Sequence, residues 1–126
     1  MTDTPGRALE VALAYFRAWT GNDLELALTY IAPDVVCDAP AGRIVGVDAY
    51  RAFLGPFVEI LLGAELLGAF GDDETATVVY DTRTVPVRSG PGAELVRVRD
   101  GRITYSRFIF DRLPFELARR SAPGAR

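Results

Sequence analysis

Residues 92–111, GAELVRVRDGRITYSRFIFD, decide the fold, because they have the pattern of two strands joined by a tight turn. Apolar and polar residues alternate on both sides of Asp100-Gly101, and this dipeptide favours the two-residue turn of a β-hairpin. We therefore expect antiparallel strands at 92–100 and 103–111.

The chain before this hairpin begins with helical patterns and continues with β-prone runs. Apolar residues recur at helical spacing in three segments, and turn or capping residues mark the ends of each. In chain order, we expect helices from Thr4-Pro5 to Gly21, from an Asn22–Glu25 capping box to Pro33, and from Asp48 to a break at Gly55-Pro56, with strands at 34–39, 63–70 and 74–86.

Helices followed by hairpin-linked strands imply an α+β fold, a curved antiparallel sheet with about three N-terminal helices on one face. The 126 residues are 49% hydrophobic, which suits one domain over residues 1–126 with a sizeable core. We expect the tail from about residue 114 to be peripheral and residues 121–126 to be disordered.

Composition excludes several kinds of chemistry. The chain has no histidine, its 14 basic residues are all arginine, and it has one cysteine. Ser-His-Asp catalysis, lysine Schiff bases, imidazole metal ligands and internal disulfides are therefore excluded. We expect no metal and no cofactor, so any proton transfer depends on Asp, Glu, Tyr or Cys37.

Charge and hydropathy limit the partners and the location. The net charge of −3 argues against nucleic acid, which requires clustered positive charge. The longest apolar run is far shorter than the roughly 20 residues that cross a bilayer, and the N-terminus lacks the features of a signal peptide. We expect a cytoplasmic protein with no membrane partner.

Three stretches carry a resemblance to a known superfamily. They are NDLELALTYIAPD (22–34), APDVVCDAPAG (32–42) and VRDGRITYSRFIFD (98–111). In this order they resemble the nuclear transport factor 2-like cone fold and, within it, the SnoaL-type polyketide cyclases and the ketosteroid isomerases. The resemblance covers roughly residues 7–113, and it implies a pocket but no particular chemistry, because this fold hosts many functions.

The resemblance also implies candidate catalytic residues. The isomerase relatives use a tyrosine on the first helix, an aspartate base at the end of the first strand and a protonated acid on a later strand. Tyr15 and Glu94 match the first and third by motif, whereas Ala39 occupies the position of the base and Asp38 lies one residue earlier.

Asp38 therefore has two alternative orientations. If the strand is regular through residue 39, Asp38 points away from the pocket, and Cys37 and Ala39 face it. If a β-bulge precedes Pro40, Asp38 turns inward and can act as the base.

Glu94 is the candidate acid. It shares an otherwise apolar stripe with Val96 and Val98, so burial would favour its neutral form. The alternative is that the strand begins only at Leu95, which would leave Glu94 in a solvated loop.

Aromatic residues predict a hydrophobic pocket, although the same rings could simply fill a core. Tyr15 could be such a core aromatic, Cys37 is typical of a small buried hydrophobe, and Asp81 could instead form a surface pair with Arg83. The candidate substrate-binding residues are Trp19, Cys37, Phe53, Phe57, Asp81, Val96, Phe108 and Phe110.

These observations favour an acid/base isomerase, cyclase or dehydratase acting on a hydrophobic polyketide- or steroid-like molecule. Asp38 would remove a proton, and Tyr15 and neutral Glu94 would stabilise the enolate. The alternatives are a non-catalytic domain that binds a hydrophobic ligand and a dimerisation domain with a filled cavity. We also expect a homodimer through the sheet face that carries Leu95, Arg97, Tyr105, Arg107 and Ile109, because this face mixes apolar residues with arginine.

Overall fold

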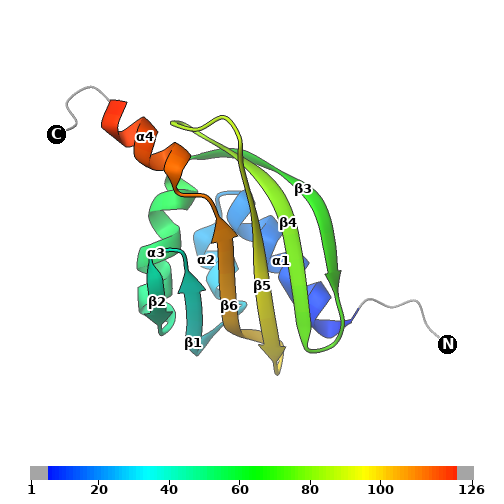
Figure 1. Ribbon diagram of the computed structural model, residues 1–126. Coiled ribbons are helices and arrows are strands. Elements are labelled where there is room, and N and C mark those ends of the chain that lie inside the picture. The colour runs from blue at the N-terminus through cyan, green and yellow to red at the C-terminus, as the bar shows by residue number, and fades with distance from the viewer. Residues whose placement is uncertain (1–5, 122–126) are drawn as a thin grey trace.

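The computed structural model describes residues 6–121 (Figure 1). Four helices and six strands make up this part of the chain. In order they are α1 (Arg7–Thr20), α2 (Leu24–Leu28), β1 (Ile31–Ala39), β2 (Gly42–Val45), α3 (Val47–Ile60), β3 (Leu61–Gly71), β4 (Thr75–Thr84), β5 (Gly90–Arg99), β6 (Arg102–Phe110) and α4 (Leu113–Ser121).

The strands form a single curved sheet in the order β2-β1-β6-β5-β4-β3. Neighbouring strands are antiparallel, except that β1 and β6 are parallel. Helices α1, α2 and α3 lie across one face of the sheet, and α4 extends from the end of β6 (Figure 1). The predicted α+β fold is confirmed.

The hairpin that decides the fold forms as expected. Arg99 pairs with Arg102 across the turn, and Asp100 and Gly101 have φ angles of 53° and 79°. Positive φ at both central residues defines the turn type that matches the twist of two antiparallel strands, and an Asp-Gly pair tolerates it. Because β5 begins at Gly90, Glu94 lies inside the strand rather than in a loop.

Three helix boundaries differ from the sequence-based expectation. Helix α2 ends at Leu28, and Ile31 begins β1 instead of continuing the helix to Pro33. Helix α3 continues through Pro56 to Ile60, because Leu54 and Val58 on either side of the proline are buried against the core and hold the helix together. Asp23, rather than Asn22, caps α2 and accepts a hydrogen bond from the Leu26 backbone N–H.

Asn22 instead joins two elements. It has a φ of 63°, and its side-chain amide donates to the carbonyl oxygens of Val58 (2.9 Å) and Leu61 (3.2 Å) at the end of α3. The sequence also did not predict β2 or α4. The expected cap at Thr4-Pro5 and the tail residues 122–126 lie outside the described residues.

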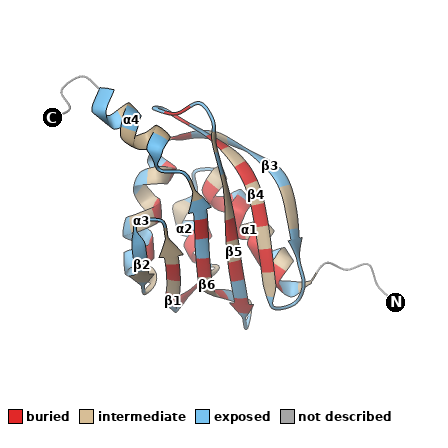
Figure 2. Ribbon diagram, viewed as in Figure 1, coloured by how far each residue is buried: buried red, intermediate tan, exposed pale blue. Residues whose placement is uncertain are grey.

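The core lies between the sheet and α1 to α3. Figure 2 shows buried residues along α1 and in alternation along β4, β5 and β6. The largest fully buried side chains include Trp19, Tyr15 and Tyr50. Within residues 6–121, no helix combines the length and the hydropathy that a membrane crossing requires.

Within residues 6–121, no helix covers the opposite face of the sheet (Figure 1). Leu95 pairs with Arg107, and Arg97 pairs with Tyr105, so these side chains share one face with Ile109. Ile109 is 57% exposed. This face therefore has the mixed apolar and arginine composition that we associate with an interface.

We predict that the protein is a homodimer that buries this face. Ile109→Glu should shift sedimentation from twice 13.7 kDa to 13.7 kDa, because a charge would be buried at the interface. Leu117→Glu on the exposed side of α4 is the matched control and should leave the mass unchanged. A parent protein that sediments at 13.7 kDa at micromolar concentration would contradict the prediction.

Candidate functional site

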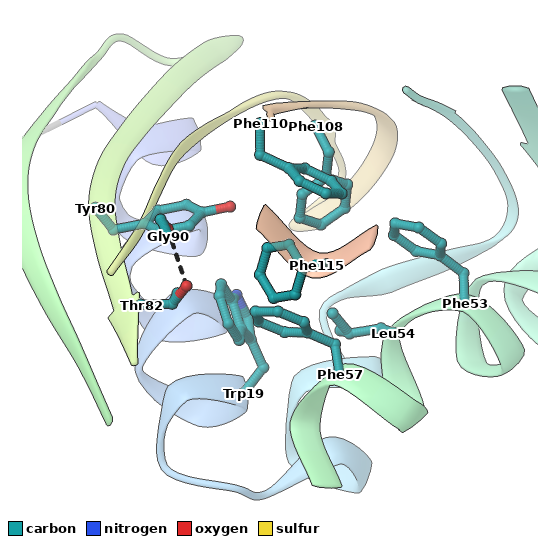
Figure 3. A pocket seen from close by; sticks show the side chains of 10 residues that line it. All are labelled: Trp19, Phe53, Leu54, Phe57, Tyr80, Thr82, Gly90, Phe108, Phe110 and Phe115. Atoms are coloured by element: carbon teal, nitrogen blue, oxygen red, sulfur yellow. Dashed lines mark hydrogen bonds between the residues drawn. The ribbon is translucent and has the colours of Figure 1, made fainter. Parts of the chain in front are cut away.

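An apolar cavity of about 200 Å³ lies between the helices and the sheet. Seven of its lining residues are aromatic, and none of the ten carries a charge (Figure 3). They are Trp19 on α1; Phe53, Leu54 and Phe57 on α3; Tyr80 and Thr82 on β4; Gly90 on β5; Phe108 and Phe110 on β6; and Phe115 on α4.

The aromatic part of the sequence-based expectation agrees with this lining. Trp19, Phe53, Phe57, Phe108 and Phe110 all line the cavity. They come from three elements whose apolar faces meet at one end of the sheet.

Phe115 closes one side of the cavity. Its ring lies 6.1 Å from that of Phe57 and 6.3 Å from that of Phe110, measured between centroids. Helix α4 has no buried residue, so this ring is its main link to the rest of the molecule. This role was not predicted, because a single phenylalanine in a short C-terminal segment does not indicate which surface it contacts.

A buried carboxyl group lies beside the cavity. Glu94 is fully buried, and its Oε2 accepts hydrogen bonds from the hydroxyl groups of Ser106 (2.5 Å), Tyr50 (3.1 Å) and Tyr15 (3.2 Å). The hydroxyl groups of Tyr15 and Tyr50 also hydrogen-bond to each other. One carboxyl oxygen is therefore the common partner of three elements, α1, α3 and β6.

Burial raises the pKa of Glu94 to about 7, although the three hydroxyl donors partly oppose the shift. Its other oxygen, Oε1, is buried without a hydrogen-bond partner in the described residues, which also favours the neutral acid.

The Glu94 cluster, which comprises Glu94, Tyr15, Tyr50 and Ser106, is separated from the cavity by a ring. None of its four members lines the cavity. Phe108 is the cross-strand partner of Glu94, and its ring lies 6.4 Å from that of Tyr50. Phe108 thus contacts the cluster on one side and the cavity on the other.

Asp38 points away from the cavity, which is the first of the two orientations that the sequence left open and the one that does not suit a base. Strand β1 is regular from Val36 to Ala39, so no bulge turns Asp38 inward. Its carboxylate accepts hydrogen bonds from Arg43 (2.8 and 2.9 Å) and from the Tyr105 hydroxyl group (2.7 Å), and it lies 3.3 Å from Arg107. The Arg43 and Tyr105 hydrogen bonds hold the pKa of Asp38 well below its usual range.

Three other expected binding residues do not line the cavity. Cys37 is buried next to Ser106, and burial raises the pKa of its thiol to about 12, which agrees with a small buried hydrophobe. Val96 lies two residues after Glu94 on the same face of β5 and is buried in the core. Asp81 lies on the face of β4 opposite to Tyr80 and accepts a hydrogen bond from the Ser89 hydroxyl group (2.9 Å).

The sequence contained partial signals for the residues that it missed. Tyr80 belongs to the inward face of β4, and Thr82 lies two residues further on the same face. Tyr50 lies on the buried side of α3. Ser106 had no distinguishing signal, because a lone serine in a strand gives no indication of a carboxyl partner.

The curved sheet, the helices on one face and the apolar cavity between them define the class of pocketed α+β domains with the nuclear transport factor 2-like fold. The structure resembles a nuclear transport factor 2-like protein from Cytophaga hutchinsonii ATCC 33406, with a TM-score of 0.72, 15% identity, and coverage of 91% of this chain and 99% of that chain. Residues 12–106 match the SnoaL-like domain, and the chain belongs to this family.

Two further solved structures are similar. A protein from Kribbella flavida DSM 17836 is 57% identical with a TM-score of 0.89, over 91% of this chain and 95% of that one. A candidate polyketide cyclase from Xanthomonas campestris pv. campestris is 25% identical with a TM-score of 0.66, over 83% and 90% of the two chains. Among curated proteins, no significant match is found.

We predict that the ionisation of Glu94 makes the free energy of unfolding depend on pH. Its pKa is raised from an ordinary 4.5 to about 7, so the folded state favours the neutral acid. The free energy of unfolding should therefore fall between these two pH values, by up to about 3 kcal/mol, as the unfolded state ionises first. Glu94→Gln should remove this slope, which urea unfolding at several pH values would measure.

Asp38→Asn is the control for this measurement. The pKa of Asp38 is lowered, so its contribution is lost as the pH falls below the ordinary range of an aspartate. Between pH 4.5 and 7, the free energy of unfolding of the Asp38→Asn variant should fall with pH as steeply as that of the parent protein. A Glu94→Gln variant with that same slope would show that Glu94 ionises normally in the folded protein.

Proposed function

We propose that the protein binds a neutral, hydrophobic, ring-containing small molecule in the cavity lined by Trp19, Phe57 and Phe110. The observation that carries this proposal is that all ten lining residues are uncharged and seven are aromatic. Aromatic walls favour flat apolar ligands through stacked and edge contacts. A charged ligand would lose its hydration without gaining a partner.

The size of the cavity limits the ligand. Its volume of about 200 Å³ is below the range of typical drug-sized sites, about 300–1,000 Å³. An apolar cavity of about 150 Å³ is large enough for benzene. A molecule of one or two rings therefore fits with little rearrangement, whereas a larger polyketide- or steroid-like molecule requires Phe115 and α4 to move outward.

A second candidate is acid/base chemistry on an enolate, for which the family and its cyclase-type neighbour give support. The Glu94 cluster favours it, because two tyrosine hydroxyl groups and a neutral acid are the donors that stabilise an enolate oxygen. Two observations count against it: Asp38 faces away, and Phe108 separates the cluster from the cavity. We therefore place binding first.

Binding can be tested by filling the cavity. Leu54 lines it and is 2% exposed, so Leu54→Phe should occupy the space and weaken binding of tetralin, a neutral two-ring hydrocarbon, at least about tenfold. Leu66→Phe on exposed β3 is the matched control and should bind like the parent protein. Isothermal titration calorimetry measures both. Equal affinity in all three proteins would place the ligand elsewhere.

Catalysis can be tested separately with 1-tetralone, which carries exchangeable protons beside its carbonyl group. We expect NMR to show deuterium exchange at this position at the rate of the buffer alone, because no carboxylate lines the cavity. Exchange that the protein accelerates and that Glu94→Gln abolishes would instead support the enolate reaction.

A further inference from the structure

One hydroxyl group in the cavity wall has no protein partner. Tyr80 is 5% exposed, and its Oη makes no hydrogen bond with any group in residues 6–121. Its hydroxyl group points into the space enclosed by the aromatic rings (Figure 3). Tyr80 Oη is not one of the fully buried unpartnered atoms of the described residues, so it is accessible from the cavity, and a ligand group can take the place of water at this hydroxyl.

The hydroxyl group of Tyr80 is held in its protonated form. Burial, and secondarily the nearby Glu94, raise the pKa of Tyr80 well above its ordinary value. It therefore offers a proton at any physiological pH. A hydroxyl donor in an otherwise apolar wall suits a ligand that carries a hydrogen-bond acceptor.

The other polar groups near the cavity do not compete for this role. The Thr82 hydroxyl group already donates to the Gly90 carbonyl oxygen (2.9 Å). The indole N–H of Trp19 is buried without an oxygen acceptor in the described residues, and its ring lies edge-on to Tyr80, at 78° and 5.5 Å. Because this nitrogen is fully buried, it is not presented to the cavity, and Trp19 offers a ligand no acceptor.

We propose that the cavity recognises a neutral aromatic ketone or a similar carbonyl compound of one or two rings, whose oxygen accepts a hydrogen bond from Tyr80. This inference rests on the proposed binding function and specifies its ligand. The rings of the ligand pack among Phe57, Phe110 and Phe115, and its carbonyl group turns toward β4. A carboxylic acid would not serve, because the lining offers its anion no cation.

The test compares two ligands of nearly the same shape. 1-Tetralone and tetralin differ only by the carbonyl oxygen, so their affinities isolate the hydrogen bond. We expect calorimetry to give about fivefold to tenfold tighter binding of 1-tetralone, the effect of one net hydrogen bond. 1-Naphthoate, an anion of similar size, should bind more weakly than both.

Tyr80→Phe removes the hydroxyl group and keeps the ring. It should abolish the preference for 1-tetralone while tetralin binds as before, which also shows that the variant is folded. Tyr105→Phe is the matched control, because Tyr105 lies on the opposite face of the sheet and donates to Asp38. It should keep the preference of the parent protein.

The single tryptophan reports which site is occupied. Trp19 lines the cavity and is the only tryptophan of the chain, so one indole N–H resonance should shift with either ligand. If both ligands shift it but bind equally, or if Tyr80→Phe keeps the preference, the carbonyl inference is wrong and the binding proposal stands. If neither ligand binds, the binding proposal itself is wrong, and the carbonyl inference is wrong with it.

Discussion

The arrangement of this protein depends on one buried carboxyl oxygen. Oε2 of Glu94, in the middle of the sheet, accepts hydrogen bonds from hydroxyl groups on α1, α3 and β6. Burying this acid is unfavourable unless such donors surround it, and the donors must come from elements that are distant in sequence. The cluster therefore fixes how α1 and α3 cross the sheet.

The cavity follows from that geometry. Once Tyr15 and Tyr50 are held against Glu94, the next turns of α1 and α3 bring Trp19, Phe53 and Phe57 over the curved sheet. Large rigid rings meet at the end of this layer. Trp19–Phe57 and Phe110–Phe115 are edge-to-face pairs with centroid distances of 6.1 and 6.3 Å, and Phe53–Phe108 is a tilted pair at 5.3 Å. Edge-to-face rings leave space between them, and Phe115 closes that space.

Much of the fold could be predicted because it depends on local patterns. The Asp100-Gly101 turn predicted the hairpin, and the alternation predicted a buried Glu94 on condition that the strand includes it, which it does because β5 begins at Gly90. The orientation of Asp38 could not be decided, because a single bulge would reverse it, and its partners Arg43 and Tyr105 lie on other strands. Ser106, Tyr50 and Phe115 were missed for the same reason: their roles arise only from contacts between distant segments.

We propose that the aromatic cavity is the functional site and that the Asp38 side of the sheet is not part of it. Intermolecular nuclear Overhauser effects between bound 1-tetralone and the protein test this most directly. We predict cross-peaks from the ligand to ring protons of Phe57, Phe110 and Phe115. Cross-peaks to the side chains around Asp38, with none to these rings, would contradict the account.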